Sequence, residues 1–98
     1  MEILKISSYS DVKSVAGSIT KVILSGKNLE IQAIGPNAVN RAVKAIAISR
    51  GHLALNGVEI SCIPTFFDAK LNGEYRSAIR FIVRFSDLGV PKNDFIQS

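Results

Sequence analysis

The chain has 98 residues, of which 47% are hydrophobic, and a formal net charge of +4 from 12 Lys and Arg against 8 Asp and Glu. This length predicts one domain, the apolar content excludes a disordered chain, and the mild positive charge would favour the approach of a polyanion. No apolar run approaches the roughly 18 residues of a membrane span, the amino terminus does not resemble a signal peptide, and the single cysteine, Cys62, can form no intrachain disulfide, so we expect a cytoplasmic protein.

The chain begins with a predicted strand and a predicted helix. Polar and apolar residues alternate over 2–7, which indicates a strand. Apolar residues then recur at helical spacing from Val12, with Asp11 as the N-cap and Gly26 as the C-cap glycine. Gly17 lies inside this helix, where a glycine costs up to about 1 kcal/mol relative to alanine. We therefore expect its missing side chain to permit close packing.

A second strand and a second helix follow. The strand is predicted over 28–34, and Pro36 suits the first position of the helix, which we expect to close at Arg50-Gly51. The apolar arc of this helix spans about 200°, wider than one contact with a sheet requires. The residues of the arc are Ala38, Val39, Ala42, Val43, Ala45, Ile46 and Ala47. We interpret the surplus as a second buried face against another subunit.

Two more strands are predicted over 58–67 and 75–85, joined by Asn72-Gly73, the strongest short signal for a hairpin. The order β-α-β-α-β-β predicts an α+β two-layer sandwich, with one mixed sheet and both helices on one face. The other face of the sheet is left uncovered, which is a further hint of association. We expect a domain over 1–85 and a loosely docked tail over 86–98.

The segment from Glu30 to Gly51 carries the clearest functional signal. A strand that runs directly into a helix presents free backbone N–H groups and the positive end of the helix dipole, which suits a phosphate. A narrow polar stripe lies on that helix, formed by Asn37, Asn40, Arg41 and Lys44. Arg41 and Lys44 could contact phosphates or belong to an ordinary solvated face. Asn37 and Asn40 could donate to phosphate or sugar, or cap the helix.

The chain offers little for catalysis. Nucleophilic catalysis needs a base beside the nucleophile, and the only histidine, His52, has no identifiable acid partner. Glu59 and Glu74 are isolated carboxylates, and no glycine-rich phosphate loop is present. Cys62, on an apolar strand, is expected to be buried and inert. We therefore expect no enzyme, no cofactor, no metal and no small-molecule substrate.

Two other side chains have two readings each. Tyr9, in a serine-rich loop, could stack on a base or pack on its neighbours. Lys5, alone in the first strand, could protect a sheet edge or point toward the turn at Gly35. The residues themselves leave both pairs of readings open.

Several short segments together are similar to the pattern of the stage V sporulation protein S family, small bacterial proteins with an Alba-like fold. The segments are Met1–Lys5, Ser14–Gly17, Glu30–Gly35, Ala42–Ala45, Ala47–Ile48, Arg50–Gly51, Cys62–Pro64 and Asn72–Glu74. They run in register over about residues 1–84, and this shared register makes the resemblance specific. The tail from Ser86 has no counterpart in the pattern.

The resemblance implies a role in sporulation or a related developmental programme. It also implies an Alba-type homodimer, or a higher oligomer, whose relatives bind DNA or RNA. Alba-like proteins carry cations in the first strand–helix loop, at the start of the second helix and on the last hairpin. Here Lys13 lies near the first place and Arg41 matches the second. Lys70 and Arg76 flank the hairpin, where they could reach a minor groove or keep the hairpin soluble.

Two functional hypotheses follow. In the first, a cytoplasmic homodimer binds DNA or RNA mainly through backbone phosphates, with little sequence preference, in sporulation or its regulation. In the second, a non-enzymatic protein-interaction or assembly module in sporulation has kept the dimer and lost nucleic-acid affinity. Two departures favour the second: the loop Ser7–Ser10 replaces lysines of archaeal relatives, and Gly35 lies between Ile34 and Pro36 where relatives carry arginines.

Overall fold

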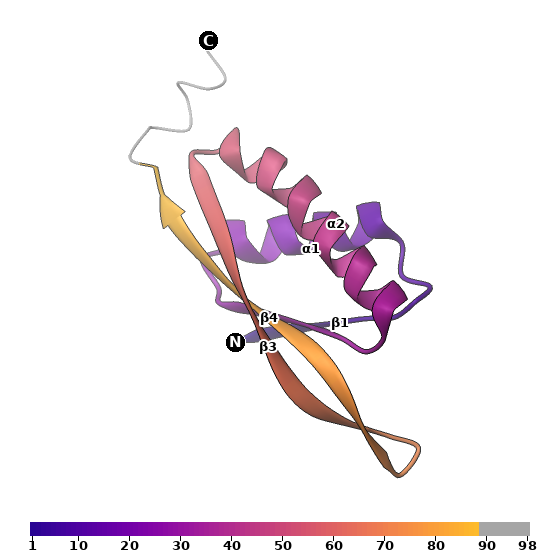
Figure 1. The fold of residues 1–98 in the computed structure, drawn as a ribbon. Coiled ribbons are helices and arrows are strands. Elements are labelled where there is room, and N and C mark those ends of the chain that lie inside the picture. Colours follow the sequence, from indigo (N-terminus) through magenta and orange to yellow (C-terminus); the bar gives the residue numbers. More distant parts are fainter. Residues whose placement is uncertain (89–98) are drawn as a thin grey trace.

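The computed structural model describes residues 1–88, which form six elements in the order β-α-β-α-β-β (Figure 1). The elements are β1 Glu2–Ile6, α1 Val12–Leu24, β2 Leu29–Ala33, α2 Pro36–Ala54, β3 Val58–Leu71 and β4 Glu74–Asp87. The strands make one mixed sheet in the order β1-β2-β4-β3, and both helices cover the same face of it. The predicted α+β two-layer sandwich is confirmed. The tail predicted over 86–98 lies, from residue 89 on, outside the described residues.

β4 lies inside the sheet and is paired on both of its edges. It runs antiparallel to β2 over residues 79–83 and antiparallel to β3 along its whole length. Because β2 has 5 residues and β4 has 14, residues 74–78 of β4 and their partners 67–71 of β3 extend past the end of β2. We call these two segments the hairpin overhang; its tip projects from the body in Figure 1.

The hairpin closes at Asn72-Gly73, as predicted. Both residues have positive φ, 52° for Asn72 and 81° for Gly73, as a type I′ turn requires. Both strands are longer than predicted, by residues 68–71 in β3 and by residues 74, 86 and 87 in β4. The backbone ladder continues between the two arms as far as Leu71 and Glu74. Ladder hydrogen bonds do not depend on an apolar side chain at each position.

The core lies between the helices and the covered face of the sheet. The residues of β2 that point into it are fully buried, as predicted: Leu29, Ile31 and Ala33. They are met by the buried residues of α1, which are Ala16, Ile19 and Ile23. Burying one such leucine or isoleucine side chain stabilises the fold by about 1.5–3 kcal/mol. The apolar face of each element thus holds the two layers together.

α1 begins and ends at its predicted caps. The carboxylate of Asp11 accepts a hydrogen bond from the Ser14 amide at 3.0 Å, and Gly26 takes a positive φ of 79° after the last turn. The expectation of close packing at Gly17 is wrong within one chain. Gly17 is exposed, and a Cβ added there would meet nothing within 4 Å.

α2 is longer than predicted and does not close at Arg50-Gly51. It continues to Ala54, because Leu53 in its last turn is fully buried and packs that turn on the core. The chain turns away at Gly57 instead, which has a φ of 73° and donates its amide to the Ala54 carbonyl at 3.0 Å. A glycine inside a helix is tolerated when tertiary packing stabilises the turns around it.

The core of the chain itself takes most of the alanine-rich arc of α2. Ala38, Ala42 and Ala45 are fully buried, so they are not available to a second subunit. The apolar residues left over on this helix are Val43, of which 49% is exposed, and Ala47, which is exposed. The surplus face is therefore narrower than the sequence predicts.

Gly17, inside α1, and Gly26, just after it, give a test of how α1 packs. We expect Gly17→Ala to raise the free energy of unfolding by about 0.5–1 kcal/mol, because alanine restricts the unfolded chain and meets no neighbour. Gly26→Ala should lower it by about 1 kcal/mol, because its positive φ disfavours a side chain. Urea denaturation of both variants measures the difference. A loss of stability in Gly17→Ala would mean that another surface packs on α1.

Candidate nucleic-acid interface

The loop between β1 and α1 is closed by its own serines. The Ser7 amide donates to the Ser10 hydroxyl at 3.0 Å, and the Ser10 amide donates to the Ser7 carbonyl at 3.2 Å. The Tyr9 amide donates to the Ser7 hydroxyl at 3.1 Å, and 92% of Tyr9 is exposed. The reading in which Tyr9 packs on its neighbours is therefore wrong, and its ring is accessible to a ligand.

Arg41 ties this loop to α2. Its Nη1 donates to the carbonyl oxygen of Ser10 at 2.9 Å, and its side chain is half-buried. The pKa of Asp11 lies below its ordinary value, first because the Ser14 hydroxyl and amide donate to the carboxylate, and then because Lys13 and Arg41 are nearby. Arg41 thus braces the loop and does not belong to an ordinary solvated face.

The start of α2 is open to solvent. Gly35 has a φ of 89° and turns the chain from β2 into the helix, whose first turn contains Pro36 and has no side-chain cap. Asn37 and Asn40 are exposed and make no side-chain hydrogen bond within residues 1–88, so the reading in which they cap the helix is wrong. Lys44 is exposed one turn further along. Free amides and an uncapped N-terminus suit an anionic ligand.

The overhang carries the last two predicted cations. Lys70 stands opposite Tyr75 in the ladder, and its Nζ lies 5.8 Å from the centre of that ring. This distance is within the range of a cation–π contact. Arg76 stands opposite Ala69, is exposed and has no ion pair within the part of the chain that the structure describes. Both side chains therefore extend from a ribbon that no helix covers.

The seven predicted residues lie on three separate segments. Lys13 is in the first turn of α1, four residues lie in the first half of α2, and two lie on the overhang. Figure 1 shows the starts of both helices and the tip of the hairpin at the same end of the fold, beyond the carboxyl ends of β1 and β2. Within residues 1–88, Lys13, Lys44, Lys70 and Arg76 have no salt bridge.

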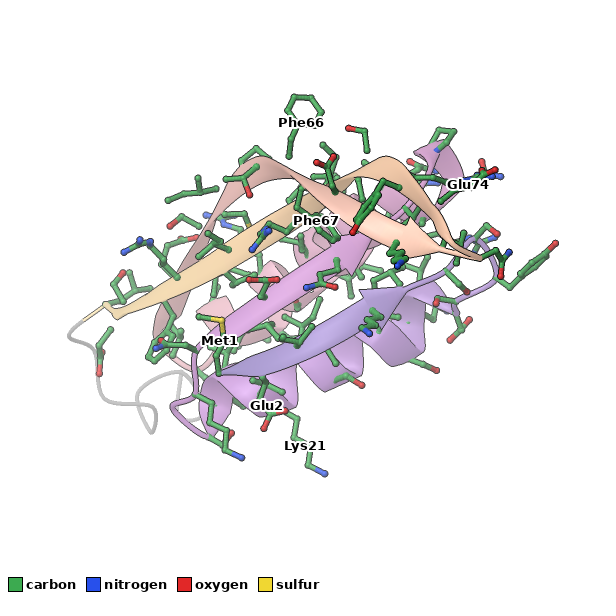
Figure 2. All side chains as sticks on the ribbon, turned by 90° about the horizontal axis from the view of Figure 1, so that it is seen from below. Met1, Glu2, Lys21, Phe66, Phe67 and Glu74 are labelled. Atoms are coloured by element: carbon green, nitrogen blue, oxygen red, sulfur yellow. The ribbon has the colours of Figure 1, made fainter. Side chains whose placement is uncertain are left out.

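The polar residues on the open face of the sheet were not predicted from the sequence as a group. This face is turned toward the viewer in Figure 2. Lys5 stands opposite Gln32, and Gln32 stands opposite Arg80, across β1, β2 and β4. Of these residues, Lys5 alone was singled out in the sequence, as a residue that could protect a sheet edge, and β1 is indeed an edge strand. The available signal was the alternation of β2 and β4, in which these polar residues occupy the positions between apolar ones.

Glu59 was expected to be an isolated carboxylate, and Cys62 was expected to be buried and inert. Glu59 is not isolated: Arg50 donates to its carboxylate twice, from Nε at 2.6 Å and from Nη2 at 2.9 Å. This hydrogen bonding holds the pKa of Glu59 below its ordinary value. Cys62 is half-buried, not fully buried as expected, and burial raises the pKa of its thiol, which favours the protonated form.

The chain matches a known protein family over most of its length. Neither helix of residues 1–88 combines the length and the apolar character needed to cross a membrane. A family model described as stage V sporulation protein S (SpoVS) matches residues 2–86, which include β1 and nearly all of β4. This match confirms the resemblance inferred from the short segments. The chain therefore belongs to the stage V sporulation protein S family, and its role is related to sporulation.

Proposed function

We propose that the protein acts in the cytoplasm during sporulation as a homodimer that binds DNA or RNA through backbone phosphates and catalyses no reaction. The observation that carries the proposal is that Lys13, Lys44, Lys70 and Arg76 form no salt bridge within residues 1–88. They lie on the two helices and the hairpin, and Figure 1 shows the starts of both helices and the tip of the hairpin at the same end of the fold. Phosphate contacts of this kind position a protein on nucleic acid without reading its sequence. Each neutralised phosphate adds a salt-dependent contribution to affinity.

The start of α2 adds a second kind of phosphate contact. Its first turn has no side-chain cap, so its amide N–H groups remain available to an oxygen acceptor. Asn37 and Asn40 are exposed beside these amides and can donate to phosphate or sugar. Arg41 supports the site by bracing the β1–α1 loop and adds its charge to the same end.

Apolar residues that the chain leaves uncovered support the dimer. Val43 is 49% exposed on α2, and Phe66 is 80% exposed on β3. Phe66 shares the covered side of the sheet with the buried Ile60, because residues an even number apart on a strand point the same way. An exposed aromatic ring on the helix-covered side of the sheet and an exposed valine on α2 favour contact with a second copy. Pairing would place two sets of cations on one assembly.

A specific observation also favours the assembly module. The overhang carries Asp68 and Glu74 as well as Lys70 and Arg76, so its net charge is zero. An overhang without net charge is a weak electrostatic partner for a polyanion. In this second candidate, the exposed Val43 and Phe66 bind another protein, and the cations only keep the surface soluble.

Lys44→Glu separates the two candidates. We expect it to weaken binding to duplex DNA or RNA about tenfold or more and to reduce the magnitude of the slope of log affinity against log salt by about 2, because each protomer of the dimer loses one phosphate contact. The unchanged dimer should show a slope of about −5, for three phosphates per protomer. Fluorescence anisotropy over a series of salt concentrations measures both.

Lys21→Glu is the matched control, since it makes the same charge change in the last turn of α1, beside Glu2 and apart from Glu74 of the overhang (Figure 2). Its affinity should stay within about twofold of the parent, because Lys21 is eight residues along α1 from Lys13, a rise of about 12 Å, which exceeds the Debye length of about 10 Å at 0.1 M salt. Equal losses of affinity in Lys44→Glu and Lys21→Glu would show that binding depends on net charge and not on a specific surface. No retention of either nucleic acid at low salt would leave the assembly module as the function.

Val43→Asp tests the pairing surface. A charge at an apolar interface costs several kcal/mol, so we expect the dimer to dissociate to single chains in sedimentation equilibrium. Leu24→Asp is the control, because Leu24 is 39% exposed at the end of α1, away from the α2 surface. Dissociation by Leu24→Asp alone would place the interface on α1 and would contradict pairing through α2.

A further inference from the structure

The open face of the sheet carries a polar row that crosses all four strands. Lys5, Gln32, Arg80 and Thr65 stand opposite one another in register, one from each of β1, β2, β4 and β3. No helix covers this face (Figure 2). Open faces of antiparallel strands are often polar, but a row that is linked by specific contacts is a built surface.

Arg80 organises this row. Its guanidinium carbon lies 4.9 Å from the centre of the Phe67 ring, and its Nη1 lies 3.7 Å from Oε1 of Glu30. Gln32 donates from Nε2 to the other oxygen of Glu30 at 2.6 Å. These contacts hold the carboxylate of Glu30, which is only 7% exposed, and fix the positions of the amide and the ring.

Three polar groups of this network lack partners. Nε of Arg80 is buried and has no hydrogen-bond partner within residues 1–88. The ammonium group of Lys5 makes no ion pair or hydrogen bond in the same part of the chain. The amide oxygen of Gln32 likewise accepts no hydrogen bond there, since only its nitrogen is engaged. Unused donors and an unused acceptor close together are a mark of a binding site.

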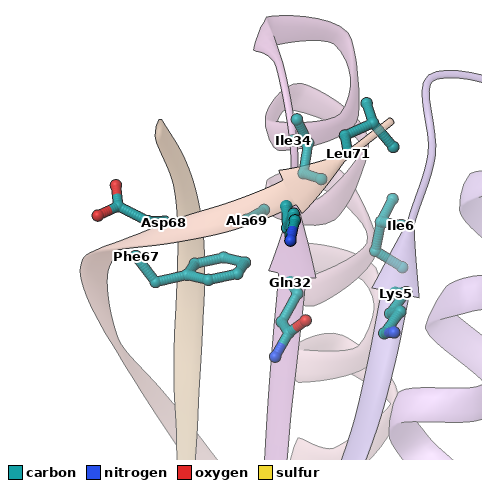
Figure 3. A pocket seen from close by; sticks show the side chains of 9 residues that line it. Lys5, Ile6, Gln32, Ile34, Phe67, Asp68, Ala69 and Leu71 are labelled. Atoms are coloured by element: carbon teal, nitrogen blue, oxygen red, sulfur yellow. The ribbon is translucent and has the colours of Figure 1, made fainter. Parts of the chain in front are cut away.

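A cavity of about 400 Å³ opens beside Lys5 and Gln32, whereas Arg80 is not among the residues that line it. Lys5 and Gln32 line one side, and the β3 arm of the overhang, from Phe67 to Leu71, lines the other. In Figure 3 the Phe67 ring is turned toward Gln32, whereas the carboxylate of Asp68 points away from the cavity. The volume falls in the range of small-molecule sites, which is about 300–1,000 Å³.

These groups define the chemistry of a ligand. The Phe67 ring, held by Arg80, presents a flat apolar wall that suits a planar ring. Gln32 offers an acceptor for the edge of that ring, and Lys5 supplies an unpaired positive charge for an anion. A phosphate ion alone would leave most of the cavity empty, and a neutral aromatic ring would leave Lys5 unpaired. A planar, hydrogen-bonding base joined to a phosphate satisfies all three.

We propose that this cavity binds a nucleotide, with its base against Phe67 and Gln32 and its phosphate on Lys5. The nucleotide is either free in solution or part of a single strand, and the chemistry of recognition is the same in both cases. The site lies on the open face of the sheet. Its recognition groups, Lys5, Gln32 and Phe67, are none of the seven residues of the proposed phosphate surface, although Lys70 of that surface also lines the cavity. It can therefore hold even if the protein binds no duplex.

Titration of the full chain with the four ribonucleoside 5′-monophosphates, inorganic phosphate and short single-stranded oligonucleotides tests this proposal, with calorimetry as the readout. We expect at least one mononucleotide or oligonucleotide to bind, and Phe67→Ala to weaken it about tenfold or more, because a base stacked on an aromatic ring is lost. Lys5→Gln should weaken it about tenfold and reduce its dependence on salt.

Lys21→Gln is the matched control for Lys5→Gln and should change affinity by no more than about twofold. Phe67→Tyr keeps an aromatic ring and should retain binding. Amide NMR shifts of the parent protein give a second readout that needs no variant: the nucleotide should move the resonances of Lys5, Gln32 and Phe67.

The outcomes are distinct. Saturation by a mononucleotide, with no tighter binding of an oligonucleotide, identifies a free nucleotide as the ligand; binding of the oligonucleotide alone identifies a single strand. The absence of binding by every nucleotide at millimolar concentration would overturn the proposal. So would equal binding of inorganic phosphate, or shift changes confined to the start of α2, since that would indicate an anion site elsewhere.

Discussion

The pairing of β4 on both of its edges is the constraint from which the rest of the architecture follows. Only residues 79–83 of β4 meet β2, so the remaining length can pair with β3 alone. A two-stranded ribbon twists more strongly than a wide sheet, which carries the β3 arm of the overhang across the ends of β1 and β2. The projecting cations and the cavity beside Lys5 and Gln32 therefore arise from one register.

The two faces of the sheet are stabilised by different physical terms. The covered face depends on apolar burial between β2 and the helices. The open face depends on polar contacts, in which Glu30 is accommodated at 7% exposure because Arg80 and Gln32 compensate its charge. A face built this way is specific in position but incomplete in hydrogen bonding, as the unpartnered Nε of Arg80 shows for residues 1–88. That combination distinguishes it from a passive solvated surface.

Features that depend on near neighbours were predicted well. The cap at Asp11, the proline at the start of α2 and the turn at Asn72-Gly73 are each determined by the conformational preferences of one or two residues. The end of α2 was predicted wrongly, because the local signal of Gly51 was weaker than the burial of Leu53 in the core. The low helix propensity of Gly51 does not end α2, because the burial of Leu53 stabilises the turn that follows it.

The amino-acid sequence by itself determined the six elements, their order and the layered fold, because periodicity and turn chemistry are local properties. The family came from the resemblance of its short segments. The sequence also identified the cations of the candidate interface. Only the tertiary structure decided which polar groups meet: Arg41 with the Ser10 carbonyl, and Arg80 with Glu30 and Phe67. Alternation along a strand shows that a side chain faces outward, but its partners depend on the register between strands. The packing of the whole core determines that register.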